Sequence, residues 1–132
     1  MKFFSVKDIK FLNSKIISNK KGNIIKIINK NNKEFIKFGE LYFSEIKKSY
    51  TKGWNLHKRY YCQIGVCYGD IEINFKDRKK KQRKFLLSLS KPKIIIIPPT
   101  IWFSIKSKSR KSLIFNILSN IHKKSETLKK EI

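Results

Sequence analysis

The sequence is poor in acidic residues, arginine, histidine and cysteine, and it contains no alanine. Its 9 Asp and Glu residues stand against 32 Lys and Arg residues, so the 132-residue chain carries a formal net charge of +23. Such a charge favours anionic partners, among them nucleic acid, membrane surfaces and phosphorylated metabolites. Most of these cations are Lys, however, and the abundance of Ile, Lys and Asn is typical of an AT-rich genome. Charge alone therefore does not identify the partner.

Few side chains are available as metal ligands. The chain has two histidines, His57 and His122, and two cysteines, Cys62 and Cys67. No acidic cluster joins the histidines and no second cysteine pair completes a zinc site, so we expect neither a metal nor another cofactor. In a strand, the odd spacing of the cysteines would point them to opposite faces, which predicts buried free thiols rather than a mutual disulfide.

Long apolar runs are absent. The Ile-rich run Ile94–Ile97 is far shorter than the roughly 20 residues that a membrane helix needs. Lys7 and Asp8 interrupt the first apolar segment, unlike the core of a signal peptide. We therefore expect a soluble cytoplasmic protein without membrane contact, folded as one domain over residues 1–132 with a sizeable core.

Short runs of β-branched and aromatic residues fill most of the chain, with turn signals about every eight to twelve residues. This spacing predicts about nine strands in an all-β sandwich or barrel. We expect a hairpin turn at Tyr68–Asp70, a solvated hairpin loop at Arg78–Lys84 and a well-buried strand pair within Phe35–Ile46. A short C-terminal helix is expected over Ser125–Ile132, capped by Ser125.

The segment Lys52–Tyr61, KGWNLHKRYY, gathers more potential chemistry than any other stretch. If it is a strand, alternate side chains share a face, so Asn55, His57 and Arg59 lie together. Trp54 then points to the opposite face. The pattern predicts a polar site carried on a sheet.

Two features of this segment have a structural as well as a functional interpretation. Gly53 is suited to a β-bulge, which would re-aim the side chain of Lys52. His57 taken alone is more often a half-exposed strand residue than a catalyst. Trp54 and Trp102 are expected to be core aromatics first, although either could line a pocket for a base or sugar ring.

The order of several segments resembles the dTDP-4-dehydrorhamnose 3,5-epimerases and the related dTDP-sugar isomerases. This family resemblance implies a single double-stranded β-helix, a jelly-roll, cupin-like fold, that acts on a nucleotide-linked 4-keto-6-deoxysugar. It also implies a role in surface polysaccharide biosynthesis and a homodimer. It spans about residues 22 to 126, and the segments that carry it are Phe38–Ile46, Lys52–Lys58, Tyr68–Arg78, Ile94–Trp102 and Asn116–Glu126.

The resemblance also implies roles for individual residues. It places Lys52 at the substrate diphosphate, and Tyr42 and Ser44 where the family contacts the nucleotide. Arg59, expected on the face of His57, is a second phosphate candidate because its guanidinium presents a fork of donors. His57 matches the second histidine of the family's K-G-W-H-x-H wording and is the catalytic candidate.

Departures from the family fall at catalytic positions. Asn55 stands where the family has its general-base histidine, and an amide does not titrate. Thr100 replaces a Gly and Phe103 replaces a His, while the tyrosine that resembles the family's general acid falls near Asn120 and Ile121. Epimerisation beside a ketone needs both a base and an acid, each worth typically ~10²–10⁴-fold.

Three hypotheses therefore remain open: an active sugar-nucleotide isomerase, a relative that binds the sugar nucleotide without turning it over, and a basic nucleic-acid-binding protein. His57 lies about 6–7 Å along the strand from Asn55, so a base there would serve a different carbon and a 3,4-keto shift is conceivable. Nucleic acid is expected to bind only nonspecifically in dilute salt, since no RNA-binding module or recognition helix is evident.

Overall fold

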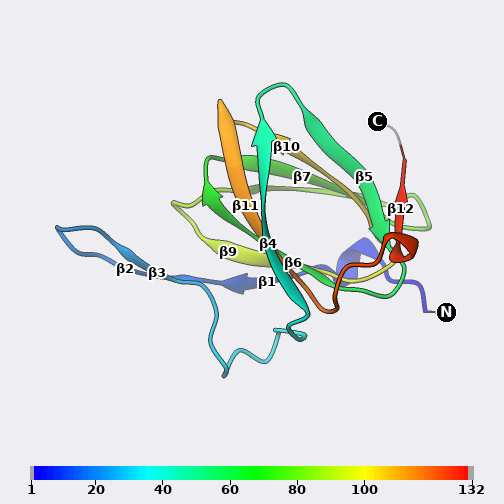
Figure 1. The fold of residues 1–132 in the computed structure, drawn as a ribbon, viewed down its shortest axis with the longest axis horizontal. Helices are drawn as coiled ribbons and strands as arrows, with labels where there is room; N and C mark the ends of the chain where they lie inside the picture. Colours follow the sequence, from blue (N-terminus) through cyan, green and yellow to red (C-terminus); the bar gives the residue numbers. More distant parts are fainter. Residues whose placement is uncertain (1, 131–132) are drawn as a thin grey trace.

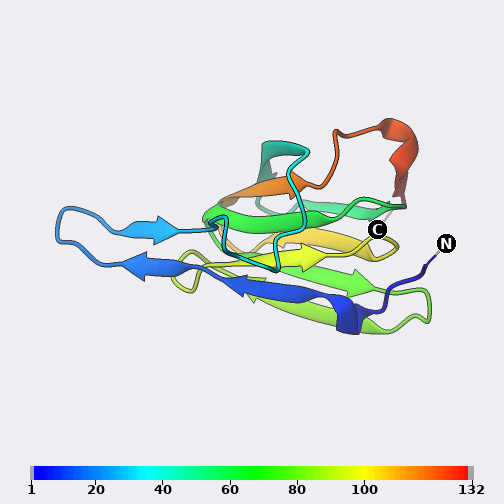
Figure 2. The ribbon, with the colours of Figure 1, turned by 90° about the horizontal axis from the view of Figure 1, so that it is seen from below.

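Two five-stranded antiparallel sheets packed face to face form the body of the protein in the computed structural model, which describes residues 2–130 (Figures 1 and 2). The first sheet has the strand order β1-β9-β6-β11-β4. The second sheet has the strand order β12-β5-β10-β7-β8. The chain passes repeatedly between the two layers. The arrangement confirms the predicted all-β, jelly-roll fold.

A two-stranded hairpin, β2-β3, projects from one end of this body (Figure 2). Residues 2–130 contain no helix long and apolar enough to cross a membrane. The bounds of the elements are η1 Val6–Asp8, β1 Lys10–Asn13, β2 Lys15–Ile17, β3 Ile24–Lys26, β4 Glu40–Lys47, β5 Thr51–His57, β6 Cys62–Tyr68, β7 Ile71–Lys76, β8 Gln82–Leu87, β9 Lys93–Ile97, β10 Trp102–Ser107, β11 Lys111–Leu118, η2 Lys124–Glu126 and β12 Thr127–Lys129.

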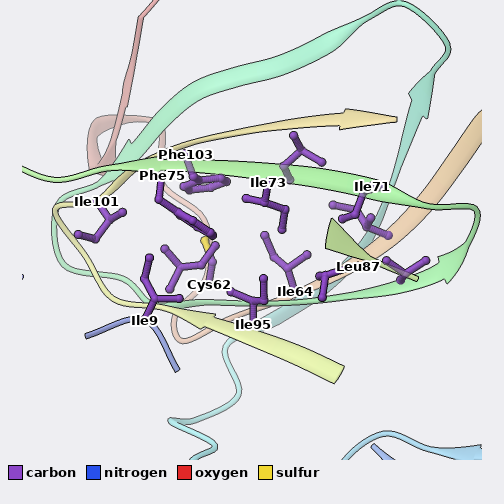
Figure 3. Packing of buried hydrophobic residues seen from close by; sticks show 14 of the residues in the cluster. Ile9, Cys62, Ile64, Ile71, Ile73, Phe75, Leu87, Ile95, Ile101 and Phe103 are labelled. Atoms are coloured by element: carbon purple, nitrogen blue, oxygen red, sulfur yellow. The ribbon is translucent and has the colours of Figure 1, made fainter. Parts of the chain in front are cut away.

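The main core lies between the two sheets. Strand β7 alternates buried Ile71, Ile73 and Phe75 with half-exposed polar residues, which is the pattern of a strand with one buried face. These side chains pack with Ile64 and Ile95 of the first sheet (Figure 3). Burying such a side chain stabilises the fold by about 1.5–3 kcal/mol.

A second apolar cluster covers part of the outer face of the first sheet. Phe115 and Ile117 of β11 pack there with Ile94 and Ile96 of β9, beneath partly buried side chains that include Phe35. Strands β9 and β11 are therefore apolar on both faces, which explains their nearly continuous Ile-rich sequences. Both cysteines are free: Cys62 is buried in the main core and Cys67 packs, half-buried, against this second cluster.

The predicted C-terminal helix over Ser125–Ile132 is wrong for the described part of that range. Lys124–Glu126 form a single 3-10 turn, and Thr127–Lys129 form β12; residues 131 and 132 lie outside the described part. Strand β12 pairs antiparallel with β5, Thr127 opposite His57 and Lys129 opposite Asn55. Ladder hydrogen bonds to a sheet edge outweigh a helix this short, which is marginal on its own.

Two other local predictions need correction. Tyr68–Asp70 does not close a hairpin, because β6 pairs with β9 and β11 whereas β7 pairs with β8 and β10. Phe35–Ile46 is not a buried strand pair: only β4 is a strand, and Phe38 and Phe43 are exposed. The basic segment does form a hairpin loop, between β7 and β8, but β8 already begins at Gln82.

The core assignment predicts a contrast between two truncations in the second sheet. Ile73→Ala should lower the free energy of unfolding by about 2–5 kcal/mol, because the side chain is fully buried and the change leaves a cavity. Leu86→Ala, at a position that is 68% exposed, should change it by less than about 0.5 kcal/mol. Urea unfolding monitored by circular dichroism measures both, and equal losses would contradict the assigned core.

Candidate functional site

A polar cavity of about 210 Å³ lies between the two sheets, next to the apolar core. Tyr42 and Ser44 of β4 line it from the first sheet. Lys52, Asn55 and His57 of β5 line it from the second sheet. The fold thus brings together, from two sheets, all but one of the site residues named from the sequence.

A bulge in β5 sets the direction of these side chains. In the pairing of β5 with β10, Asn55 lies opposite Phe103 and Gly53 lies opposite Ser104, so Trp54 is the extra residue. Gly53 has a φ of 118°, which favours glycine, and a Cβ there would lie 2.7 Å from the carbonyl oxygen of Phe103. The bulge predicted at Gly53 is therefore present, and glycine is required for it.

The bulge changes the face on which Lys52 lies. Without the extra residue, Lys52 and Asn55 would point to opposite faces, because their spacing is odd. With it, both line the cavity. The Lys52 ammonium donates a hydrogen bond of 2.8 Å to Ser44 Oγ, which links β5 to β4 across the mouth of the sandwich. A fixed cation is thereby held at the edge of the cavity.

His57 is buried, with 6% of its surface exposed, and its ring is nearly parallel to the rings of Tyr60 and Phe103 at centroid distances of 6.4 and 6.2 Å. Its Nδ1 is 3.1 Å from Thr127 Oγ1, which in turn is 3.4 Å from His122 Nε2. One hydroxyl proton cannot serve both rings, so one imidazole must be the donor to Oγ1. Both histidines of the chain thus meet at one hydroxyl.

Burial, and to a smaller extent the nearby His122, lowers the pKa of His57 from 6.5 to about 4. The ring is therefore neutral at neutral pH. A neutral imidazole can accept a proton, but so low a pKa makes it a weak general base. Its position inside a low-dielectric cavity, more than the charge of His122, sets this property.

Tyr42 contributes a phenol that holds its proton. Burial, together with smaller charge effects, raises its pKa to about 12. Asn116 Nδ2 donates to Tyr42 Oη at 2.9 Å, and Asn116 Oδ1 accepts from the Gln63 backbone N–H at 3.2 Å. Since the phenol oxygen is already an acceptor, its own O–H is left to donate to a ligand.

Arg59 is the site residue that the fold does not bring into the cavity. Strand β5 ends at His57, so the alternation of faces does not extend to Arg59. The Arg59 side chain is 81% exposed, and its Nε lies 3.9 Å from Oε2 of the largely buried Glu126. So exposed and so long an ion pair contributes little to stability.

Four polar residues that line the cavity lie outside the site residues named from the sequence: Asn116, His122, Thr127 and Lys129. Asn116 had a signal, because it is the lone polar residue within the apolar run of β11. Thr127 had none, since its position depends on β12 pairing with β5. Residues 2–130 contain no group of three or more His, Cys, Asp or Glu side chains that could hold a metal ion.

A family model matches nearly the whole chain. The model of the family described as FdtA, WxcM-like C-terminal, matches residues 7–131. The chain belongs to this family. No curated protein matches the sequence of this chain.

Solved structures share the fold. A dTDP sugar isomerase from Desulfovibrio desulfuricans G20 is 21% identical with a TM-score of 0.88, over 96% of this chain and 85% of that one. A His-to-Asn variant of the 3,4-ketoisomerase QdtA from Thermoanaerobacterium thermosaccharolyticum, in complex with TDP-4-keto-6-deoxyglucose, is 18% identical with a TM-score of 0.81, over 94% and 88%. A dTDP-4-dehydrorhamnose 3,5-epimerase from Elizabethkingia anophelis NUHP1 is 15% identical with a TM-score of 0.78, over 96% and 78%. The resemblance to dTDP-sugar isomerases and epimerases is thus confirmed.

The low pKa of His57 predicts a pH-dependent stability. Between pH 6.5 and about 4 the unfolded chain binds a proton at this residue that the folded protein does not, so stability falls as the pH falls through this range. The free energy of unfolding that is lost through protonation of His57 is about 3 kcal/mol. Urea unfolding at pH 7 and pH 4.5 should show a larger drop for the wild type than for His57→Gln. Equal drops would contradict the buried, neutral imidazole.

Proposed function

We propose that this protein binds a dTDP-linked 4-keto-6-deoxysugar in the cavity between its two sheets. The observation that carries the proposal is the convergence of Tyr42 and Ser44 with Lys52, Asn55 and His57 at one cavity. The sequence resemblance, taken alone, assigns these residues to a sugar-nucleotide site. The family membership, and the sugar nucleotide bound by the structural neighbour QdtA, support the same class of ligand.

The charges and donors of the cavity suit such a ligand. The ammonium of Lys52 lies at the edge of the cavity, where a diphosphate would find a cation. The O–H of Tyr42 is a neutral donor for a ribose or base oxygen. The buried end of the cavity, at His57 and Phe103, is small and partly apolar, as a deoxysugar ring requires.

The chemistry at this site is expected to be slow. Asn55 stands where the family has its base, and an amide takes no proton from a carbon beside a ketone. His57 is neutral but weakly basic, and the phenol of Tyr42 has a pKa too high to deliver a proton efficiently near neutral pH. In this proposal the protein binds the sugar nucleotide well and exchanges its protons poorly.

If turnover occurs, His57 is the residue that can carry it. Its Nδ1 is engaged by Thr127, which leaves Nε2 as the ring nitrogen without a hydrogen bond among the described residues. The Thr127 hydroxyl also approaches the exposed His122, so a proton taken up at His57 has a short route to solvent. A base displaced from Asn55 favours a 3,4-keto shift over 3,5-epimerisation.

Asn55→His tests the missing base. The wild type should bind a dTDP-4-keto-6-deoxysugar but exchange its C3 and C5 protons with solvent very slowly. Asn55→His should raise that exchange, by up to the ~10²–10⁴-fold that a positioned base supplies. Deuterium incorporation followed by NMR measures it. Exchange should recover more than product formation, because Asn120 and Ile121 stand where the family's general-acid tyrosine is expected and neither delivers a proton.

Two results would contradict this account of the site. Rapid exchange in the wild type that disappears in His57→Ala would show that His57 has taken over as an efficient base. Unchanged exchange in Asn55→His, with binding preserved, would show that more than the base has been lost. Arg59→Ala is the matched control, because the structure places Arg59 outside the cavity, and it should leave both binding and exchange unchanged.

We further propose that the protein is a homodimer formed through the outer face of the first sheet, and that it serves deoxysugar synthesis for surface polysaccharide in the cytoplasm. Leu41 and Phe43 of β4 are exposed and lie opposite Ile117 and Phe115, so they extend the apolar cluster on that face. The β2-β3 hairpin, which projects from the body (Figure 1), carries further exposed isoleucines, Ile16, Ile17 and Ile24. Exposed apolar side chains on the face of the first sheet favour a protein partner.

A single charged substitution in the proposed dimer interface tests the homodimer. Light scattering should give about twice the 15.7-kDa chain mass for the wild type. Phe43→Lys should give a monomer, because it buries a cation in an apolar interface. Leu86→Lys, at an equally exposed apolar position on the second sheet, should leave the mass unchanged. A monomeric wild type at physiological salt would contradict the proposed dimer.

A further inference from the structure

A second cavity lies on the outer face of the second sheet, on the opposite side of β5 from the sugar-nucleotide cavity. We call it the outer pocket; its volume is about 500 Å³. Its floor contains Trp54 and Leu56 of β5, Trp102 of β10 and Leu128 of β12. Alternation along β5 separates it from the inner cavity, which Asn55 and His57 line. The proposed function does not use this pocket.

The floor is made by cross-strand neighbours. Leu56 lies directly opposite Leu128 in the β5–β12 pair, which forms an apolar patch. Trp102 lies directly opposite Lys76 in the β10–β7 pair, so an indole and an ammonium share one face. Trp54 is the bulged residue of β5. Two half-buried indoles on adjacent strands therefore face an open cavity. A flat ring of a ligand could stack on them there.

The rim of the outer pocket is basic. Lys58, Lys76, Arg78 and Lys80 line it, and none of them forms an ion pair within residues 2–130. The guanidinium of Arg78 is held 4.1 Å from the ring centroid of Phe3, which also lines the pocket. These cations come from the segment after β5, from the end of β7 and from the β7–β8 loop, so they are brought together by the fold.

The carboxylate that lines the pocket, Asp77, forms no ion pair with these four cations among the described residues. Its Oδ2 accepts from the Val6 backbone N–H at 3.1 Å, and its Oδ1 accepts from the Lys79 and Lys81 backbone N–H groups at 2.9 and 3.0 Å. Burial alone would raise the pKa of Asp77, but these backbone hydrogen bonds lower it. Asp77 is therefore engaged in holding the loop, and the cations remain available to an anion.

The positive charge of the rim favours an anionic ligand. A second copy of this chain would set like charges against one another, so the outer pocket is not suited to self-association. An apolar ligand would leave the cations unused. A nucleotide supplies both required parts, a flat ring for the indoles and phosphates for the Lys and Arg side chains, and the cavity has the size of a small-ligand site, which is about 300–1,000 Å³.

We propose that the outer pocket binds a nucleoside phosphate, with its base against Trp54 and Trp102 and its phosphates at the rim cations. The site is separate from the proposed sugar-nucleotide cavity and does not depend on activity there. Strand β5 forms a wall of both.

Intrinsic fluorescence reports on this pocket, because Trp54 and Trp102 are the chain's two tryptophans and both line it, and the Trp102 and Lys52 variants below distinguish it from the inner cavity. The probes are ADP, GDP, CDP and UDP at 150 mM salt, with inorganic pyrophosphate as a charge-only probe and a twelve-residue oligo(dA) as a nucleic-acid probe. At least one nucleoside diphosphate should quench the fluorescence saturably. Pyrophosphate should bind at least about tenfold more weakly, because it lacks a ring to stack.

Matched variants locate the site. Arg78→Ala should raise the dissociation constant of the bound nucleotide about tenfold or more, the effect of losing a hydrogen bond to a charged group. Arg110→Ala removes the same charge from an exposed turn and should change nothing. Trp102→Leu should weaken binding about tenfold, with Trp54 left to report it. Lys52→Ala, in the inner cavity, should leave the quenching unchanged, which separates the two sites.

Three results would overturn the proposal. The first is the absence of saturable quenching by any of the four nucleotides. The second is equal binding of pyrophosphate, or equal effects of Arg78→Ala and Arg110→Ala, which would show a diffuse charge effect. The third is tight oligo(dA) binding without nucleotide binding, which would make this face a nucleic-acid surface. Circular dichroism of each variant checks that it is folded.

Discussion

The pairing of β5 with β10 on one side and β12 on the other is the constraint on which the rest of the structure depends. The extra residue at Trp54 lets one strand present Lys52, Asn55 and His57 to the interior. Without the bulge, Lys52 would leave the cavity and its bond to Ser44 would be lost. The backbone at position 53 has a positive φ that glycine adopts without strain. Gly53 therefore determines which side chains of β5 face the inner cavity and which face the outer pocket.

Burial governs the chemistry of the inner cavity more than charge does. The chain has a net charge of +23, yet the perturbed pKa values of His57 and Tyr42 arise first from loss of solvent. Both groups are kept neutral, one as a weak acceptor and the other as a donor. Lys52 is the cation placed at the cavity edge by a defined hydrogen bond. Under the proposed function, these groups hold the sugar nucleotide and move its protons only slowly.

Alternation and turn spacing were sufficient for the fold class and for placing Asn55 with His57, whereas Lys52, Tyr42 and Ser44 were assigned by the family resemblance. Turn spacing predicts many short strands, and period-two patterning places Asn55 with His57. Features that depend on strand pairing were not predictable. Local turn chemistry at Tyr68–Asp70 cannot show that β6 and β7 belong to different sheets, and nothing within Ser125–Ile132 shows that Thr127 pairs with His57.

The same limit explains Arg59 and the outer pocket. Arg59 was assigned by extending alternation past the end of β5, where it no longer applies. The cations around Trp54 and Trp102 are scattered through a Lys-rich sequence, and only the fold distinguishes them from other solvated lysines. Composition shows that the chain is basic, whereas topology shows where that charge meets an aromatic surface.

The central claim is that the sugar nucleotide lies between the two sheets. A crystal structure of the protein grown with TDP-4-keto-6-deoxyglucose tests it most directly. The account predicts the sugar ring beside Asn55 and His57, with the diphosphate at Lys52 and the Tyr42 hydroxyl donating to the ligand. An ordered sugar nucleotide found only in the outer pocket, or an empty inner cavity at ligand concentrations that saturate a 3,4-ketoisomerase, would contradict it.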